Sequence, residues 1–101
     1  STVGLNQNEI TIAELLKDVP GEITVSGHTD NIPIAFSERF ESNWDLSAAR
    51  AAAVADFFMD AGRVTEERIN VLGFADTKPI ASNDSPTGRA QNRRIEILVD
   101  N

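Results

Sequence analysis

The chain has 101 residues, of which 41% are hydrophobic and 25% charged, a composition that suits one compact domain and argues against a disordered segment. Its 16 acidic and 9 basic residues give a formal net charge of -7, which repels phosphate backbones, so nucleic acid is not expected as a partner. The absence of cysteine excludes a disulfide scaffold, a thiolate metal site and a cysteine nucleophile.

A short helix is the first element expected along the chain. Apolar residues at positions 12, 15, 16 and 19 follow the i, i+3, i+4, i+7 spacing of one helical face, and Pro20-Gly21 ends the pattern. Residues 1–8 are expected to be the stub of a linker or a strand. No apolar run approaches the roughly 20 residues that cross a bilayer, so any membrane or targeting segment is expected outside this chain.

A strand and a long loop follow. In residues 22–29, Ile23 and Val25 alternate with polar residues, which predicts a strand with one buried face. Residues 30–43 contain Pro33 and several charges, with neither the helical nor the strand period. We interpret them as a loop, and a loop of that length in a compact domain is usually functional or mobile.

Residues 43–61 carry the strongest helical pattern. Its central apolar line is predicted to consist of Leu46, Ala49, Ala53, Phe57 and Ala61, flanked by Val54 and Phe58. Ser42 or Asn43 is suited to cap the N-terminus, Asp45 complements the positive end of the helix dipole, and Gly62 is expected just past the C-terminus.

The last third of the chain predicts two more strands. Residues 65–67 suggest one capped turn, residues 68–75 a strand, residues 76–88 a polar loop, residues 89–92 a helical turn and residues 94–99 a final strand. Strands 22–29 and 68–75 are joined through the long helix and should be parallel. The chain is therefore expected to form a single α/β domain, a two-layer sandwich with helices on one face of a small mixed sheet.

Charged residues are expected to meet where strand 22–29 ends. Asp30 follows that strand, and Arg50 lies in the second turn of the next helix, whose N-terminus belongs at the same edge of the sheet. A carboxylate and a guanidinium at one rim suit a zwitterion, because Asp30 can pair with an ammonium group and Arg50 with a carboxylate. The alternative is that Asp30 and Arg50 only pair with each other.

Three segments in this order, GHTD (27–30), NxxLSxxRA (43–51) and GRAxNRRIEI (88–97), resemble the signature of OmpA-like peptidoglycan-binding domains. The resemblance covers about residues 22–100 and implies the fold of that family. It assigns Asp30 and Arg50 to the ammonium and carboxylate groups of meso-diaminopimelate in the peptidoglycan stem peptide. It also implies supporting roles for Asn43 and Arg93, with Thr29 beside them, and neither a cofactor nor a metal.

Within that family, the long loop with Asn31-Ile32-Pro33-Ile34 and the sequence SNWDLSAARA at 42–51 are similar to the flagellar stator B subunits, MotB and PomB. This similarity implies a periplasmic domain of a single-pass inner-membrane protein. It also implies a MotA- or PomA-type partner and a homodimer in the intact protein. A shorter loop is usual in Pal-type lipoprotein anchors, which are the alternative within the same fold.

A small cell-wall hydrolase is the alternative from another class. It would use Asp30 with His28 or a bound metal, yet His28 is the only histidine, which excludes a histidine-rich metal site. We interpret His28 as a structural residue beside the site. Trp44 either stacks on a sugar or packs at the rim of the core. Arg94 is expected to pair with a neighbouring acid.

Overall fold

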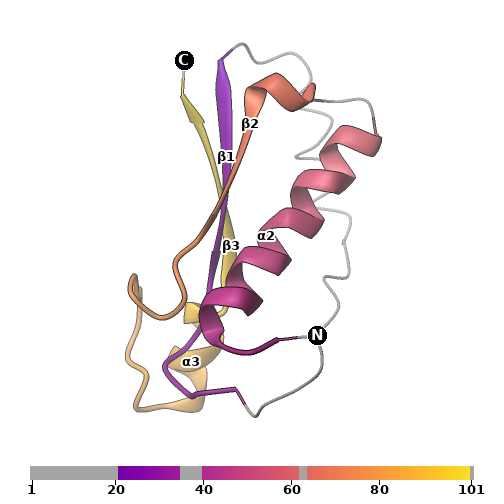
Figure 1. Ribbon diagram of the computed structural model, residues 1–101. Helices are drawn as coiled ribbons and strands as arrows, with labels where there is room; N and C mark the ends of the chain where they lie inside the picture. Colours follow the sequence, from indigo (N-terminus) through magenta and orange to yellow (C-terminus); the bar gives the residue numbers. More distant parts are fainter. Residues whose placement is uncertain (1–20, 35–39, 62–63, 101) are drawn as a thin grey trace.

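The computed structural model describes residues 21–34, 40–61 and 64–100 (Figure 1). The predicted helix at 12–19, the segment 1–8 and Gly62 lie outside these ranges. Within them the element order is β1 (Glu22–His28), α2 (Asn43–Asp60), the short 3-10 helix η1 (Glu66–Arg68), β2 (Ile69–Gly73), α3 (Pro86–Asn92) and β3 (Arg94–Asp100).

The described strands form a mixed sheet in the order β2-β1-β3. β1 is parallel to β2, with Gly27 opposite Gly73, and antiparallel to β3, with His28 opposite Arg94. The predicted parallel pair and the two-layer α/β fold are thus confirmed. Because β3 begins beside the end of β1, the preceding helix α3 lies at the carboxyl end of β1, at the bottom of Figure 1.

Helix α2 covers one face of the sheet and packs very closely on β1 (Figure 1). A Cβ on Gly27 would lie 2.0 Å from the Ser47 carbonyl oxygen, and one on Gly73 would lie 2.8 Å from the Ala48 nitrogen. Only glycine allows this approach, so Gly27 and Gly73 bring the start of α2 against the ends of β1 and β2. The core between the two layers consists of Ile23, Val25, Ala51, Val54, Ala55, Phe58 and Val64.

The predicted central line of α2 is confirmed at Leu46, which is buried, and wrong farther along the helix. Ala53 and Ala61 are exposed and Phe57 is half-buried, whereas Val54 and Phe58, expected as flanking residues, are 2% and 0% exposed. The buried face is therefore rotated by about one residue, roughly 100°, from the predicted one. Because alanine occurs on several sides of α2, the apolar pattern alone does not fix the angle of the buried face.

Element ends differ from expectation by more than one residue at two places. Helix α3 begins at Pro86 rather than residue 89, with Ser85 as N-cap accepting a hydrogen bond from the Gly88 N–H. Strand β2 ends at Gly73 rather than residue 75, because Ala75 adopts a left-handed backbone conformation with φ of 52°. At α2 the N-cap is Ser42, whose side chain accepts from the Asp45 N–H, as one of the two predicted caps.

Candidate functional site

The carboxylate of Asp30 lies at the carboxyl end of β1 and has two partners. Its Oδ1 accepts a hydrogen bond from the Ile32 N–H at 3.0 Å, which closes a tight turn, and its Oδ2 pairs with Nη1 of Arg93 at 2.7 Å. The Asp30 side chain is 12% exposed and that of Arg93 45% exposed. Asp30 is therefore mostly buried, and its carboxylate forms an ion pair with Arg93.

The N-terminus of α2 holds the loop that follows Asp30. Asn43, the first residue of α2, donates through Nδ2 to the carbonyl oxygens of Ile32 at 3.1 Å and Asp30 at 3.5 Å. The second of these is long for a hydrogen bond, so the contact to Ile32 is the stronger. Asn43 therefore acts on the backbone beside the carboxylate, which agrees with a supporting role.

Thr29 and Ser47 connect three segments at this edge of the sheet. The Thr29 N–H donates to the Ala75 carbonyl at 2.8 Å, and the Thr29 hydroxyl donates to the Asp30 carbonyl at 2.8 Å. The hydroxyl of Ser47, which is fully buried, accepts from the Ala75 N–H at 3.0 Å and donates to the Trp44 carbonyl at 3.1 Å. Left-handed backbone at a non-glycine residue is strained, and these bonds on both polar groups of Ala75 compensate for it.

Asn92 is the residue of this region that sequence reasoning missed. It is 0% exposed, and its Oδ1 accepts from the N–H groups of Ile80 at 2.7 Å and Ala81 at 3.0 Å. Its Nδ2 donates to the Ala81 carbonyl and to Oδ1 of Asn83. The amide thereby fixes loop 80–83 and the chain position directly before Arg93. Asn92 lies in the GRAxNRRIEI segment that stands out in the sequence. The residue spacing of that segment does not indicate which backbone groups the Asn92 side chain bonds.

The structure brings four of the five predicted site residues together. Asp30 contacts Arg93 and Asn43, and Thr29 adjoins it in the chain. Arg50, the fifth, is half-buried in the second turn of α2. It lies seven residues after Asn43, which places it on the same side of the helix and about 10 Å farther along the axis.

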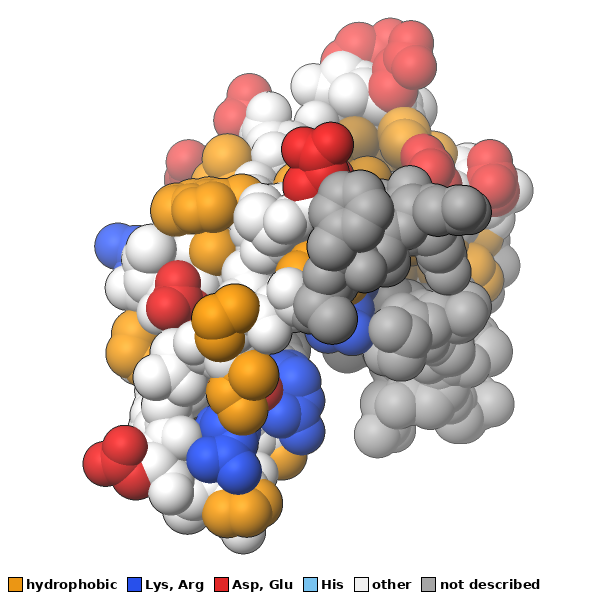
Figure 2. Space-filling model, turned by 60° about the horizontal axis from the view of Figure 1, so that its bottom comes forward, with side chains coloured by type: hydrophobic (Ala, Val, Ile, Leu, Met, Phe, Trp, Pro, Cys, Tyr) orange, Lys and Arg blue, Asp and Glu red, His pale blue; other side chains and the backbone are white. Residues whose placement is uncertain are grey.

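Basic side chains gather at this end of the molecule, which Figure 2 turns forward. Arg89 in α3 donates to the Asn83 carbonyl, and Arg94 donates to Glu96 at 2.6 Å and to the carbonyls of Asn92 and Lys78. Arg94 thus pairs with Glu96, two residues along its own strand.

His28 lies buried behind the site, 3% exposed, and stacks on Phe74 with ring centroids 5.2 Å apart. Its Nε2 is 3.1 Å from the Ser26 hydroxyl and 3.8 Å from Glu96. Burial, followed by the positive charge of Arg94, lowers the pKa of His28. The imidazole is therefore neutral at pH 7, in agreement with a structural role.

The contacts of His28 with Ser26 and Glu96 do not form a nucleophilic triad. Ser26 is 2% exposed, so a substrate has no access to its hydroxyl. Serine and glutamate also share one ring nitrogen of His28, whereas a triad needs them on opposite nitrogens. Residues 21–34, 40–61 and 64–100 contain no cluster of histidine or carboxylate side chains that could hold a metal ion. Nor does this part of the chain include a helix long and apolar enough to span a bilayer.

Curated relatives cover most of this chain. Motility protein B of Bacillus subtilis is 40% identical over 85 residues, which are 84% of this chain and 32% of that protein. The peptidoglycan-binding protein ArfA of Mycobacterium tuberculosis is 43% identical over 90 residues, 88% of this chain and 26% of ArfA. The chain thus spans about a third or less of the length of these relatives.

Solved structures of similar proteins superpose closely on this chain. The C-terminal domain of Helicobacter pylori MotB superposes with a TM-score of 0.86 at 32% identity, covering 97% of this chain and 77% of that one. The cell wall anchor of the type VI secretion system from Pseudomonas aeruginosa superposes with a TM-score of 0.84 at 42% identity, covering 97% and 70%. Residues 6–93 match the OmpA family, and the chain belongs to it as a MotB-like domain.

Proposed function

We propose that this domain binds the diaminopimelate-containing stem peptide of peptidoglycan without catalysing a reaction. The observation that carries the proposal is the Asp30 carboxylate, held at the end of β1 by Arg93 and the Ile32 N–H. A carboxylate offers about four acceptor positions, and these two bonds use two of them. The remaining positions accept an ammonium group of the ligand.

Arg50 provides the opposite charge in this proposal. A guanidinium binds a carboxylate with two parallel hydrogen bonds, which lysine cannot reproduce. Diaminopimelate carries an ammonium and a carboxylate on one carbon at the end of its side chain, so both charges enter together. Asn43 and Thr29 keep the backbone around Asp30 in place, and Arg93 holds the carboxylate in its orientation.

Binding to the wall serves, in this proposal, to anchor a flagellar stator. The domain would lie in the periplasm as part of a single-pass inner-membrane protein that pairs as a homodimer and works with a MotA- or PomA-type subunit. Similarity to motility protein B over 84% of this chain supports this assignment. The similarity to a secretion-system anchor supports a second candidate, in which the same wall contact holds a different machine.

The test is co-sedimentation of purified variants with peptidoglycan sacculi, alongside thermal unfolding. Asp30→Asn keeps the shape of the side chain and removes its charge, and Arg50→Ala removes the guanidinium. We expect each to raise the dissociation constant for sacculi at least tenfold, the change that follows from losing one charge-assisted contact of about 1.5–3 kcal/mol. The control is Asp56→Asn, which makes the same charge change on the exposed side of α2 and should bind like the parent.

Both variants should remain folded at 25 °C. Because Arg93 is 45% exposed, its ion pair with Asp30 contributes only about 1 kcal/mol to stability. Folded variants that sediment like the parent would overturn the proposal. In a cell with flagella, the same substitutions in the parent protein should impair swimming at unchanged protein level, and intact swimming would favour the second candidate.

A further inference from the structure

His28 lies on the face of the sheet opposite α2, directly behind the site. A Cβ on the preceding Gly27 would meet Ser47 of α2, and side chains alternate between the two faces along a strand, so the imidazole points away from the helix. Helix α2 covers the other face (Figure 1), yet His28 is only 3% exposed. Its ring stacks on Phe74, and Arg94 stands opposite it in β3.

The hydrogen bonds around this ring suit its neutral form. Nε2 of His28 lies 3.1 Å from the Ser26 hydroxyl and 3.8 Å from Oε1 of Glu96. Nδ1 is buried, and no group of the described residues forms a hydrogen bond with it. A neutral imidazole can leave one nitrogen as an unused acceptor, whereas the protonated ring has an N–H on both nitrogens. Protonation in this position therefore creates a buried donor without an acceptor, which is unfavourable.

The charged groups around His28 act in the same direction on balance. Burial has the largest effect on its pKa and lowers it, Arg94 and Lys78 lower it further, and Glu96 raises it. The Glu96 carboxylate is already held by Nε of Arg94 at 2.6 Å. A protonated His28 would compete with Arg94 for that carboxylate, so a positive charge on the ring disturbs the ion pair beside it.

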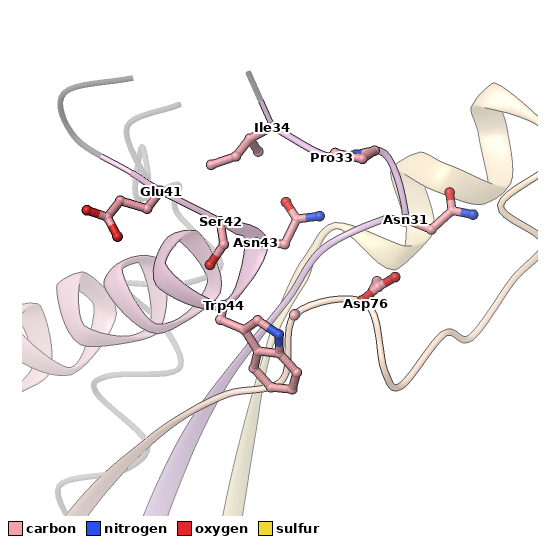
Figure 3. Close-up of a pocket in the computed structure, with 9 residues that line it drawn as sticks. Asn31, Pro33, Ile34, Glu41, Ser42, Asn43, Trp44 and Asp76 are labelled. Carbon is pink, nitrogen blue, oxygen red and sulfur yellow. The ribbon is translucent and has the colours of Figure 1, made fainter. Parts of the chain in front are cut away.

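Both members of the ring stack are close in the chain to the front of the site. Asp30 and Asn31 follow His28 by two and three residues, and Asp76 follows Phe74 by two. Figure 3 shows Asn31 and Asp76 on the loops after β1 and β2, where they line a cavity of about 300 Å³. A displacement of the stacked rings is therefore passed to both loops.

Arg94 connects the same network to Arg93, the ionic partner of Asp30. The two arginines are consecutive, and Nη1 of Arg94 donates to the Asn92 carbonyl at 3.1 Å, which belongs to the peptide group before Arg93. Its Nη2 donates to the Lys78 carbonyl at 2.8 Å. The Arg94 side chain thus fixes the backbone that carries Arg93, and it does so while its Nε holds the carboxylate next to the imidazole.

We propose that neutral His28 is a positioning residue that holds the Asp30–Arg93 pair in its binding geometry, and that protonation of His28 in mild acid weakens binding to the wall. This rests on the proposed function in one respect, that the domain binds peptidoglycan through Asp30. A displaced imidazole regains its ordinary pKa of 6.5, above that of the buried ring. The binding geometry is therefore favoured above pH 6.5 and is progressively lost as the pH falls below it.

The first measurement is co-sedimentation with sacculi at pH 7.5 and 5.5, with thermal unfolding at both pH values to confirm that the domain is folded. We expect the dissociation constant of the parent to rise about three- to tenfold in acid, within the limit of tenfold per pH unit that one proton sets. His28→Gln places an amide near the position of Nε2 and does not titrate, so its affinity should be independent of pH. The same loss of affinity in acid for both proteins would overturn the proposal.

Two further variants keep His28 and change the charges that face it. Lys78→Gln removes a cation that lowers the His28 pKa, so the midpoint of the pH dependence should move to higher pH. Glu96→Gln removes the opposing carboxylate and should move the midpoint to lower pH. Glu67→Gln is the matched control, since Glu67 is exposed in η1, at the opposite end of the sheet, and should leave the midpoint unchanged. Shifts in the reverse directions would contradict the proposal.

Nuclear magnetic resonance of the free domain tests the connection without a wall. The Ile32 N–H donates to Oδ1 of Asp30, so its amide resonance reports on the position of that carboxylate. We expect the His28 ring and the Ile32 amide to titrate with the same midpoint, and this step at Ile32 to disappear in His28→Gln. An Ile32 resonance that does not follow the titration of His28 would also overturn the proposal.

The outcomes separate this proposal from the proposed function. If the parent binds sacculi equally well at pH 7.5 and 5.5, the role of His28 is wrong and the proposed function stands. If the parent binds sacculi at neither pH while the Ile32 amide follows His28, the proposed function fails, and the positioning of Asp30 by His28 stands without it.

Discussion

At the scale of single residues, His28 makes the stability of the domain depend on pH. It is buried against Phe74, and three ionisable groups face it, Arg94, Glu96 and Lys78. Burial and the cations lower its pKa, against the smaller opposing effect of Glu96. In the unfolded chain His28 has its ordinary pKa of 6.5, so the unfolded state binds the proton more readily.

We therefore expect the free energy of unfolding to be constant just above pH 7 and to fall as the pH drops below about 6.5. His28 is the only histidine of the chain, and cysteine is absent, so no other side-chain type has its reference pKa between pH 7.5 and 5.5. Urea unfolding across this interval measures the effect. Stability that is flat, or that rises on acidification, would contradict the neutral, desolvated imidazole.

Asn92 carries a second prediction at this scale, because its side chain makes four hydrogen bonds inside the fold. Asn92→Ala leaves the N–H groups of Ile80 and Ala81 without that acceptor. We expect a loss of about 2–4 kcal/mol in unfolding free energy, since unpaired, partly buried groups cost about 1–3 kcal/mol each.

Asn70→Ala is the matched control for this change. Asn70 is exposed, and its amide makes one 3.4 Å bond to Glu22, so its loss should cost less than about 0.5 kcal/mol. Equal melting temperatures for the two variants would show that loop 80–83 is held by other contacts. A stability loss at Asn92 accompanied by weaker sacculus binding would place its effect on the position of Arg93.

At the scale of elements, helix α2 gives a test of which face is buried. Phe58 is 0% exposed in the core, whereas its neighbour Phe57 is half-buried. Phe58→Ala should cost about 3–5 kcal/mol through lost burial and a residual cavity, and Phe57→Ala clearly less. Chemical unfolding of the two variants, which remove the same atoms from adjacent positions, measures the difference. A larger loss for Phe57→Ala would restore the face first predicted from sequence.

The elements also show what sequence could and could not predict. The strands and their parallel pairing followed from alternation and from the β-α-β order, because these depend on neighbouring residues. The start of α3 was missed although Ser85 and Pro86 form a usual helix start, since Pro79 and Pro86 together were interpreted as loop residues.

The candidate site was also predicted only in part from the sequence. The expectation that the end of β1 and the start of α2 meet follows from topology, and Asn43 confirms it by contacting the loop after Asp30. The ion pair of Asp30 with Arg93 joins residues 63 positions apart. Periodicity carries no information at that separation, so only the resemblance placed Arg93 near the site.

At the scale of the whole molecule, the charge of -7 acts on association between copies. Like charges repel two copies of the domain, and β2, one of the two edge strands among the described residues, is only five residues long and offers few backbone groups for pairing. Its Val71 and Leu72 are 38% and 45% exposed, which is a small apolar surface. A stable interface needs about 800 Å² from each partner.

We therefore expect the isolated domain to be a monomer or a weak, concentration-dependent dimer, whereas the intact protein is proposed to form a homodimer. A membrane-embedded pair would hold two domains together and raise their effective concentration, which the isolated domain lacks. Raising the salt concentration should shift the equilibrium toward the dimer, because a Debye length of about 10 Å at 0.1 M screens the repulsion between copies. Light scattering at low and high salt over a range of protein concentrations measures this. A tight tetramer or ring at micromolar concentration, or dissociation on adding salt, would show that the surface contains an attractive contact strong enough to outweigh the net charge.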